Sequence, residues 1–219
     1  MTRPVADAVK LVVVGAGGHA KVVLEVLWAA GGFEVAGLVD PNPAEAEVLG
    51  VTVLGGDDIL PGLRSQGVAA AVVALGSNGV RERVGDGLRA MGFVLPAAVH
   101  PSALVSPSAR IGAGAVIMAR AVLGTSSEVG ELAIVNTGAI VEHDNRIGRA
   151  AHVAPGTALA GTVTVGDRAL VGVGSAVRPG VRIGADAVVG AGSAVVADVP
   201  DGARVGGVPA RPLRRGGAA

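Results

Sequence analysis

The sequence predicts an α/β domain over residues 1–98, a short-period parallel β-solenoid over residues 99–200 and a C-terminal tail over residues 201–219. Strand-like and helix-like segments alternate in the first part, whereas an aliphatic residue recurs at every sixth position in the second. The chain also has 36 glycines but only three aromatic residues, Trp28, Phe33 and Phe93. A core of small and β-branched residues at close spacing is typical of a repetitive architecture.

The first part follows the pattern of a small Rossmann-like domain. Short aliphatic runs at residues 11–14, 35–39, 51–54 and 70–75 predict four strands. A helix is expected after the first run, with Val22, Val23, Val26 and Leu27 on its apolar face, and another over residues 80–91. Strands that alternate with helices form a parallel sheet, and such sheets bind ligands at the carboxyl ends of their strands.

The second part repeats with a period of six residues. From Val99 to Val195, 17 consecutive sixth positions are Val, Ile or Leu, without one insertion; we call them the anchor residues. A small residue often stands four positions after an anchor, as at Ala103 and Ala139. Neither a helical period nor simple alternation produces this pattern. A β-solenoid of more than five coils does, because each anchor points inward and stacks on the next coil.

Composition excludes several classes of function. The formal net charge is zero, and no basic cluster occurs before Arg211, Arg214 and Arg215, so we expect no nucleic-acid partner. There is no cysteine, which excludes thiolate chemistry and is compatible with a reducing compartment. No apolar run approaches the ~20 residues that span a bilayer, and the N-terminal residues do not resemble a signal peptide. We therefore expect a soluble cytoplasmic protein with no membrane partner.

The repeat resembles the hexapeptide-repeat family. That resemblance implies a left-handed triangular β-helix with three hexads in each coil, and it implies a homotrimeric acyltransferase that uses acetyl-CoA or a related thioester.

His143 is the candidate catalytic residue of the repeat. It stands two positions after the inward-facing Val141, so we expect it near a corner, open to solvent or to another subunit. Asn145 occupies a slot that elsewhere takes a small residue, and a local break in a repeat's rule often marks function. Histidine is suited to remove a proton from an attacking amine near neutral pH, and a neighbouring carboxylate orients its ring. Asp144 is the first candidate for that carboxylate and Glu142 the second.

The segment from Asn136 to Asp144, followed by His152, makes the resemblance closer. It is similar to the nucleotide-sugar N-acetyltransferases that act on UDP-4-amino-4,6-dideoxy sugars and GDP-perosamine, to which sialic acid O-acetyltransferases are related. The resemblance implies that His143 is the general base, that Asp144 assists it and that His152 contacts acetyl-CoA. Residues 207–210, Gly-Val-Pro-Ala, resemble the family's closing segment near the cofactor.

Coil geometry suggests further cofactor-binding positions. Residues 18 apart should stack in columns roughly 4.8 Å apart, which places Val173 with Ala191 and His143 with Gly161. A pantetheine arm could run along such columns between two subunits, where small residues permit close approach. Tight corners alone would also explain why these residues are small.

The N-terminal domain contains a candidate nucleotide site. The turn Gly15-Ala16-Gly17-Gly18-His19-Ala20 approximates the glycine fingerprint that holds a diphosphate at a helix N-terminus. Asp40 ends the second strand, where dinucleotide folds place an acid that binds the ribose or base. By resemblance to the related acetyltransferases, the residues that face the sugar nucleotide are Gly17, Gly18, His19, Asp40, Gly76 and Asn78. A capping role without a ligand is the alternative for His19.

The sequence thus predicts direct acetyl transfer from acetyl-CoA to the amine of a nucleotide-linked sugar, without a covalent acyl-enzyme. O-acetylation of a sialic acid-type sugar is one alternative, and a non-catalytic nucleotide-binding scaffold is another. A metalloenzyme of the β-helical carbonic anhydrase type is disfavoured because such a site needs three histidines, and His100 lies far from His143 and His152. We expect no metal.

Overall fold

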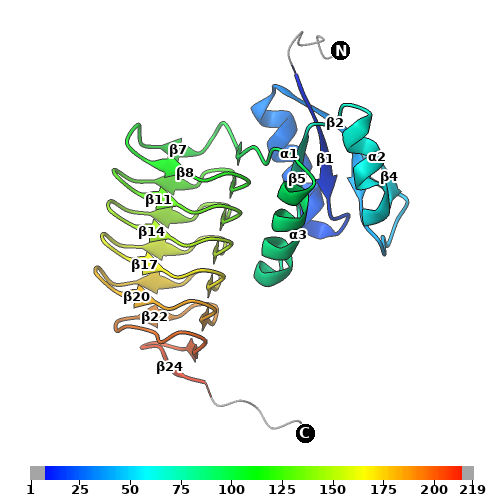
Figure 1. Cartoon of the computed structure of the whole chain (residues 1–219). Coiled ribbons are helices and arrows are strands. Elements are labelled where there is room, and N and C mark those ends of the chain that lie inside the picture. Colours follow the sequence, from blue (N-terminus) through cyan, green and yellow to red (C-terminus); the bar gives the residue numbers. More distant parts are fainter. Residues whose placement is uncertain (1–7, 214–219) are drawn as a thin grey trace, which may run out of the picture. The chain divides into compact units, whose positions relative to one another are not determined.

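The computed structural model describes residues 8–213. The chain divides into two compact units, with the boundary between Pro101 and Ser102 (Figure 1). Among the described residues, no helix is both long enough and apolar enough to cross a membrane.

The first unit is built on a five-stranded sheet with the strand order β3-β4-β2-β1-β5. The central strand β1 pairs in parallel with both β2 and β5, and β4 extends the parallel sheet, whereas β3 pairs with β4 in the antiparallel sense. The strands are β1 (Val9–Val14), β2 (Phe33–Val39), β3 (Glu47–Val48), β4 (Val51–Gly55) and β5 (Ala70–Val73), and β6 (Ala98–Val99) follows near the end of the unit. The helices are α1 (Gly18–Ala30), η1 (Asp57–Ile59), α2 (Leu60–Ser65) and α3 (Asn78–Ala90).

The four predicted strands and both predicted helices are present. The sequence pattern did not reveal β3 or α2, because two and six residues are too few to show a period. The expected apolar face of α1 was wrong at one position: Val22 is 39% exposed, whereas Val23, Val26 and Leu27 are buried. Val22 lies beside the i, i+3, i+4 stripe that Ala20, Val23, Leu24 and Leu27 form.

The second unit is a left-handed parallel β-helix whose short strands form three faces. The first face contains β7 (Leu104–Val105), β10 (Val122–Leu123), β13 (Ile140–Val141), β16 (Ala158–Leu159), β19 (Ala176–Val177) and β22 (Ala194–Val195). The second face contains β8 (Arg110–Ile111), β11 (Glu128–Val129), β14 (Arg146–Ile147), β17 (Thr164–Val165) and β20 (Arg182–Ile183). The third face contains β9 (Val116–Ile117), β12 (Ile134–Val135), β15 (His152–Val153), β18 (Leu170–Val171), β21 (Val188–Val189), β23 (Arg204–Gly206) and β24 (Arg211–Pro212).

The predicted register is confirmed. Val135 pairs with Ile117 in one coil and with Val153 in the next, so three hexads make one coil. The anchors from Ile117 to Val195 are buried, whereas Val105 in the first coil is 36% exposed because no complete coil precedes it.

Each corner turns on the third residue after an anchor. From Gly114 to Gly192 these residues all have a left-handed backbone, with φ between 52° and 74°. Several carry side chains, including Leu132, Asp144 and Thr162, although this conformation costs a residue other than glycine roughly 1–2 kcal/mol. The ladder of hydrogen bonds between coils therefore imposes the corner, and the glycine pattern in the sequence does not determine it.

Candidate active site

His143 and Asp144 form a paired site at the corner after β13. The imidazole Nδ1 lies 2.8 Å from the Asp144 carboxylate Oδ2, and both side chains are 57% exposed. An ionised carboxylate can only accept, so Nδ1–H donates and the free lone pair of a neutral ring is on Nε2. Asp144 has a φ of 58°, which an aspartate tolerates better than most residues. The corner thus gives an oriented imidazole whose unprotonated nitrogen faces away from the carboxylate.

The structure distinguishes the two candidate carboxylates. Glu142 accepts a hydrogen bond from the backbone N–H of His143 at 3.3 Å. Its contact is therefore with the chain, and Asp144 is the acid that contacts the ring.

Gly161 lies in the next coil under the His143 ring. A Cβ added at Gly161 would collide with the imidazole at Nε2 and Cε1. The backbone also joins the two coils here, because the N–H of Thr162 donates to the carbonyl of His143 at 2.9 Å. Gly161 is buried, and the absence of a side chain at this position leaves room for the His143 ring.

Asn145 fixes the corner from inside the β-helix. Its side chain is fully buried, and its amide donates to the carbonyls of Glu142 at 2.8 Å and Ala160 at 3.0 Å. Its Oδ1 accepts from the N–H of Val163 at 2.6 Å. Asn145 therefore ties the His143 corner to the coil that carries Gly161. The break in the repeat pattern at this slot was the signal for this role.

Gly161, one of the predicted cofactor positions, thus adjoins His143, whereas the other three lie elsewhere on the β-helix. His152 projects from β15, half-buried, with Nε2 3.0 Å from the amide nitrogen of Asn136. The amide N–H donates, so Nε2 of His152 is an acceptor in this contact. Val173 and Ala191 occupy one column of exposed corner residues, as predicted, and Val173 is 53% exposed. Residue Arg211 of the basic tail is exposed, whereas Arg214 and Arg215 lie outside the described residues.

In the first unit, Asp40 organises the glycine turn. Its Oδ2 accepts from the N–H of Ala16 and its Oδ1 from the N–H of Asn42, each at 2.9 Å. Both oxygens thus hold backbone, which ties the turn after β1 to the end of β2.

The glycines of this turn serve different purposes. Gly15 has a φ of +111°, and a Cβ there would lie 2.7 Å from the carbonyl oxygen of Ala74, so packing requires glycine. Gly17, Gly18 and, in the turn after β5, Gly76 have no heavy atom within 4 Å of an added Cβ. Packing does not explain glycine at these three positions, because a side chain there would project into open space.

The helix ends at these turns are open. α1 begins after Gly17 and α3 after Ser77, and neither has a side-chain cap or an acidic residue in its first turn. Neither helix N-terminus is therefore neutralised by an acidic side chain of its own first turn, and the positive end of a helix dipole attracts anions.

His19 lies in the first turn of α1 with an unusual environment. Its Nε2 is buried and has no hydrogen-bond partner among the described residues. Burial, followed by the charge of Arg81, lowers the pKa of His19 to about 4, so the ring is neutral at pH 7. Sequence analysis missed Arg81, although its spacing from Val84 and Leu88 places it on the apolar stripe of α3.

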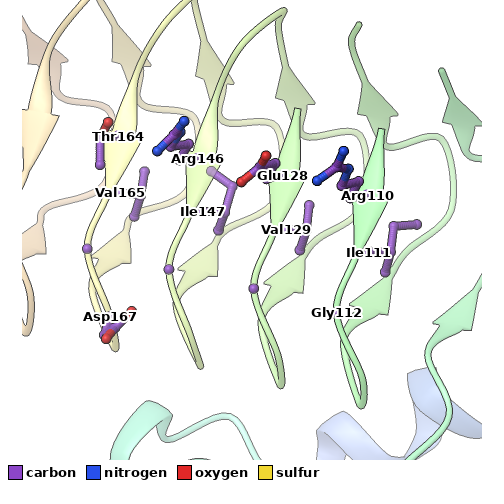
Figure 2. Close-up of a pocket in the computed structure, with 13 residues that line it drawn as sticks. Arg110, Ile111, Gly112, Glu128, Val129, Arg146, Ile147, Thr164, Val165 and Asp167 are labelled. Atoms are coloured by element: carbon purple, nitrogen blue, oxygen red, sulfur yellow. The ribbon is translucent and has the colours of Figure 1, made fainter. Parts of the chain in front are cut away.

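A groove of about 430 Å³ runs along the second face of the β-helix (Figure 2). It is lined by the column of Arg110, Glu128, Arg146 and Thr164, by the anchors that follow them and by the glycines after those anchors. None of the predicted site residues lines this groove. Among the described residues there is also no group of three His, Cys, Asp or Glu side chains that could hold a metal ion.

An α/β domain with an open glycine turn, joined to a β-helix with a corner His–Asp pair, defines a hexapeptide-repeat acyltransferase. Residues 10–88 match the family model of the PglD N-terminal domain. Comparison with curated protein sequences gives no match.

Solved structures extend the likeness to almost the whole chain. PerB from Caulobacter crescentus, solved with CoA and GDP-perosamine, is 51% identical, with a TM-score of 0.90 over 94% of this chain and 97% of PerB. The acetyltransferase domain of PglB from Neisseria gonorrhoeae is 39% identical, with a TM-score of 0.90 over 94% of this chain and 100% of that domain. WeeI from Acinetobacter baumannii is 26% identical, with a TM-score of 0.84 over 93% of this chain and 99% of WeeI. The chain therefore belongs to the family of hexapeptide-repeat sugar N-acetyltransferases that includes PerB.

Proposed function

We propose that this protein transfers an acetyl group from acetyl-CoA to the amino group of a nucleotide-linked 4-amino-4,6-dideoxy sugar. The observation that carries the proposal is the His143–Asp144 pair, on a chain 51% identical to an enzyme solved with CoA and GDP-perosamine. Perosamine N-acetyltransferase has also been solved as variants in which one histidine is replaced by asparagine or alanine. That choice of variants supports a role for histidine in the chemistry of this family.

In the proposed mechanism, His143 accepts the proton that the amine loses as its nitrogen attacks the thioester carbonyl. Asp144 holds the ring in the required tautomer and stabilises the imidazolium that forms. The new C–N bond replaces the C–S bond, and the thiolate leaves with a proton available from His143. A backbone N–H would stabilise the oxyanion. Direct transfer needs no nucleophilic side chain, which fits a chain that has no cysteine.

The two units would divide the ligands between them. The turns at Gly17, Gly18 and Gly76 offer free backbone donors and open space, which suits the diphosphate of the sugar nucleotide. On the β-helix, His152, Val173 and Ala191 would hold acetyl-CoA, which supplies the activated acyl group. An exposed column of small and apolar residues fits an extended pantetheine arm.

We further propose a homotrimer. The residues before the anchors point outward, and on the first face of the β-helix they are all apolar: Leu104, Val122, Ile140, Ala158, Ala176 and Ala194. Leu104 is 71% and Ile140 40% exposed. The second face carries charges at four of its five corresponding positions instead. A second copy against the first face would bury its apolar column and give the exposed cofactor positions another wall.

Turnover of purified protein tests the activity. Acetyl-CoA with GDP-perosamine, or with a UDP-4-amino-4,6-dideoxy sugar, should release CoA thiol and give a product that resists mild base, as an amide does. A base-labile product formed from a hydroxyl acceptor such as a CMP-sialic acid would favour O-acetylation. Tight binding of a sugar nucleotide without thiol release would favour the alternative of a non-catalytic nucleotide-binding scaffold.

Light scattering tests the assembly. Three times the mass of one 219-residue chain is expected. An Ala176→Arg change on the first face should produce monomers, whereas Thr164→Arg on the second face should not. A monomeric wild-type protein at micromolar concentration would contradict the proposal.

A further inference from the structure

Arg81 is a charged residue on the buried side of α3, and it is only 1% exposed. Burial lowers its pKa to about 10, so the guanidinium is still charged at neutral pH. It donates through Nη1 to the carbonyls of Leu75 at 3.0 Å and Gly76 at 3.2 Å. Through Nη2 it donates to the side-chain oxygen of Asn78 at 2.9 Å. Leu75 and Gly76 belong to the turn between β5 and α3, and Asn78 is the first residue of α3.

These contacts determine which way the peptide groups of the turn point. In a trans peptide the C=O and the N–H lie on opposite sides, and these peptides are trans. Because Arg81 holds the carbonyls of Leu75 and Gly76, the N–H groups of Gly76 and Ser77 point away from the guanidinium. Neither N–H has a backbone partner among the described residues. The turn therefore presents two donors in one direction.

This turn adjoins the glycine turn of α1. β5 pairs directly with β1, and a Cβ at Gly15 would lie 2.9 Å from the Leu75 side chain. The buried, unpartnered Nε2 of His19 lies in the same part of the domain, close enough to Arg81 for that charge to lower the histidine pKa. Burying a charged arginine costs free energy unless its hydrogen bonds are made. Because Arg81 makes these hydrogen bonds to the carbonyls of one turn, the conformation of that turn is what the buried charge stabilises.

We infer that Arg81 is a positioning residue for sugar-nucleotide binding: from beneath the β5–α3 turn it aims the N–H groups of Gly76 and Ser77 and the side chain of Asn78 at the ligand. This inference rests on the proposed function, because it assigns the first unit to the sugar nucleotide. Arg81 does not touch the ligand itself. It acts through the turn, and its positive charge adds long-range attraction for an anionic diphosphate.

The experiment compares Arg81→Met and Arg81→Lys with Arg83→Met, an exposed arginine two residues along the same helix. Circular dichroism first establishes that each variant is folded. Steady-state kinetics then measure kcat and both Michaelis constants, and calorimetry measures binding of GDP-perosamine and of CoA. Arg81→Met should raise the KM and Kd of the sugar nucleotide about tenfold or more, with kcat and the KM of acetyl-CoA nearly unchanged. Arg81→Lys should recover part of the loss, and Arg83→Met should match wild type.

Three results would overturn the inference. A folded Arg81→Met variant with wild-type affinity for the sugar nucleotide would show that the turn does not need the guanidinium. Equal losses for both ligands, or a fall confined to kcat, would indicate a general structural role. If Arg81→Met unfolds, an Arg81→Lys variant with normal KM values would likewise contradict a positioning role. Wild-type protein that binds no sugar nucleotide would instead refute the proposed function.

Discussion

The imidazole of His143 occupies the space that a Cβ on Gly161, eighteen residues further along the chain, would need. The ring of the proposed base is thus held between the Asp144 carboxylate on one side and the backbone of the next coil on the other. Glycine at position 161 is what allows this placement. The next coil of the β-helix therefore helps to place the ring of the proposed base.

Gly161→Ala should displace the His143 ring and lower kcat by roughly 100-fold, the loss that a shift of about 1 Å can cause. Both Michaelis constants should change little, because the substitution adds only a methyl group beneath the ring. Gly190→Ala is the matched control, since a Cβ there has its nearest contact at 3.4 Å and needs no displacement. Steady-state assays of both variants measure the effect. Normal turnover by Gly161→Ala would contradict the proposed position of the active ring.

His143→Ala should lower kcat by roughly 10²–10⁴-fold, the usual contribution of a general base, with small changes in KM. Asp144→Asn should cost less, because it removes the negative charge but keeps a residue that tolerates the left-handed φ of 58°. Thermal unfolding of each variant serves as the control for folding. Near-normal activity of the His143 variant would refute the mechanism.

A single substitution in either unit should weaken the binding of only one of the two ligands. Gly18→Val places a branched side chain where the diphosphate would approach the backbone, so sugar-nucleotide affinity should fall severely while CoA affinity survives. The space is otherwise open, so the protein itself should tolerate the change. His152→Ala should have the reverse effect and raise the KM of acetyl-CoA more than that of the sugar. Calorimetric titration of each ligand into each variant gives the comparison. Intact sugar-nucleotide binding by Gly18→Val would require another role for the first unit.

The pKa of His19 predicts an acid dependence of stability. The pKa is about 4 in the folded protein and near 6.5 in the unfolded chain, so between these values only the unfolded chain binds this proton. The free energy of unfolding should therefore fall as the pH drops from 6.5 to 4, by about 3 kcal/mol at most, and this contribution should level off below pH 4. His19→Gln should reduce this dependence, with His100→Gln as the control. Urea unfolding followed by the fluorescence of Trp28, the only tryptophan, reports on the first unit. An unchanged pH dependence in His19→Gln would contradict the assignment.

Sequence periodicity alone predicted most of the fold. The β-helix register followed from the anchors, because inward-facing residues of a stacked coil must repeat with the coil, and Val135 pairs with Ile117 and Val153 as expected. The four predicted strands of the first unit were correct for a similar reason, since strands buried in a parallel sheet are continuous aliphatic runs. Short elements such as β3 and α2 carry too few residues for a period and appeared only in the structure.

By itself, the sequence determined that a histidine with neighbouring carboxylates lies at a corner of the β-helix and that a glycine turn follows the first strand. Only the tertiary structure decided that Asp144, and not Glu142, contacts the ring, because rotamers and corner geometry determine that choice. It also decided that Gly161 makes room for the ring and that Asn145 bridges two coils. The helical period places Arg81 on the apolar stripe of α3, but its hydrogen bonds join the helix to the turn before it, and no periodic pattern encodes such contacts. Periodic burial can be recognised from the order of residues along the chain, whereas contacts between particular polar atoms depend on packing in three dimensions.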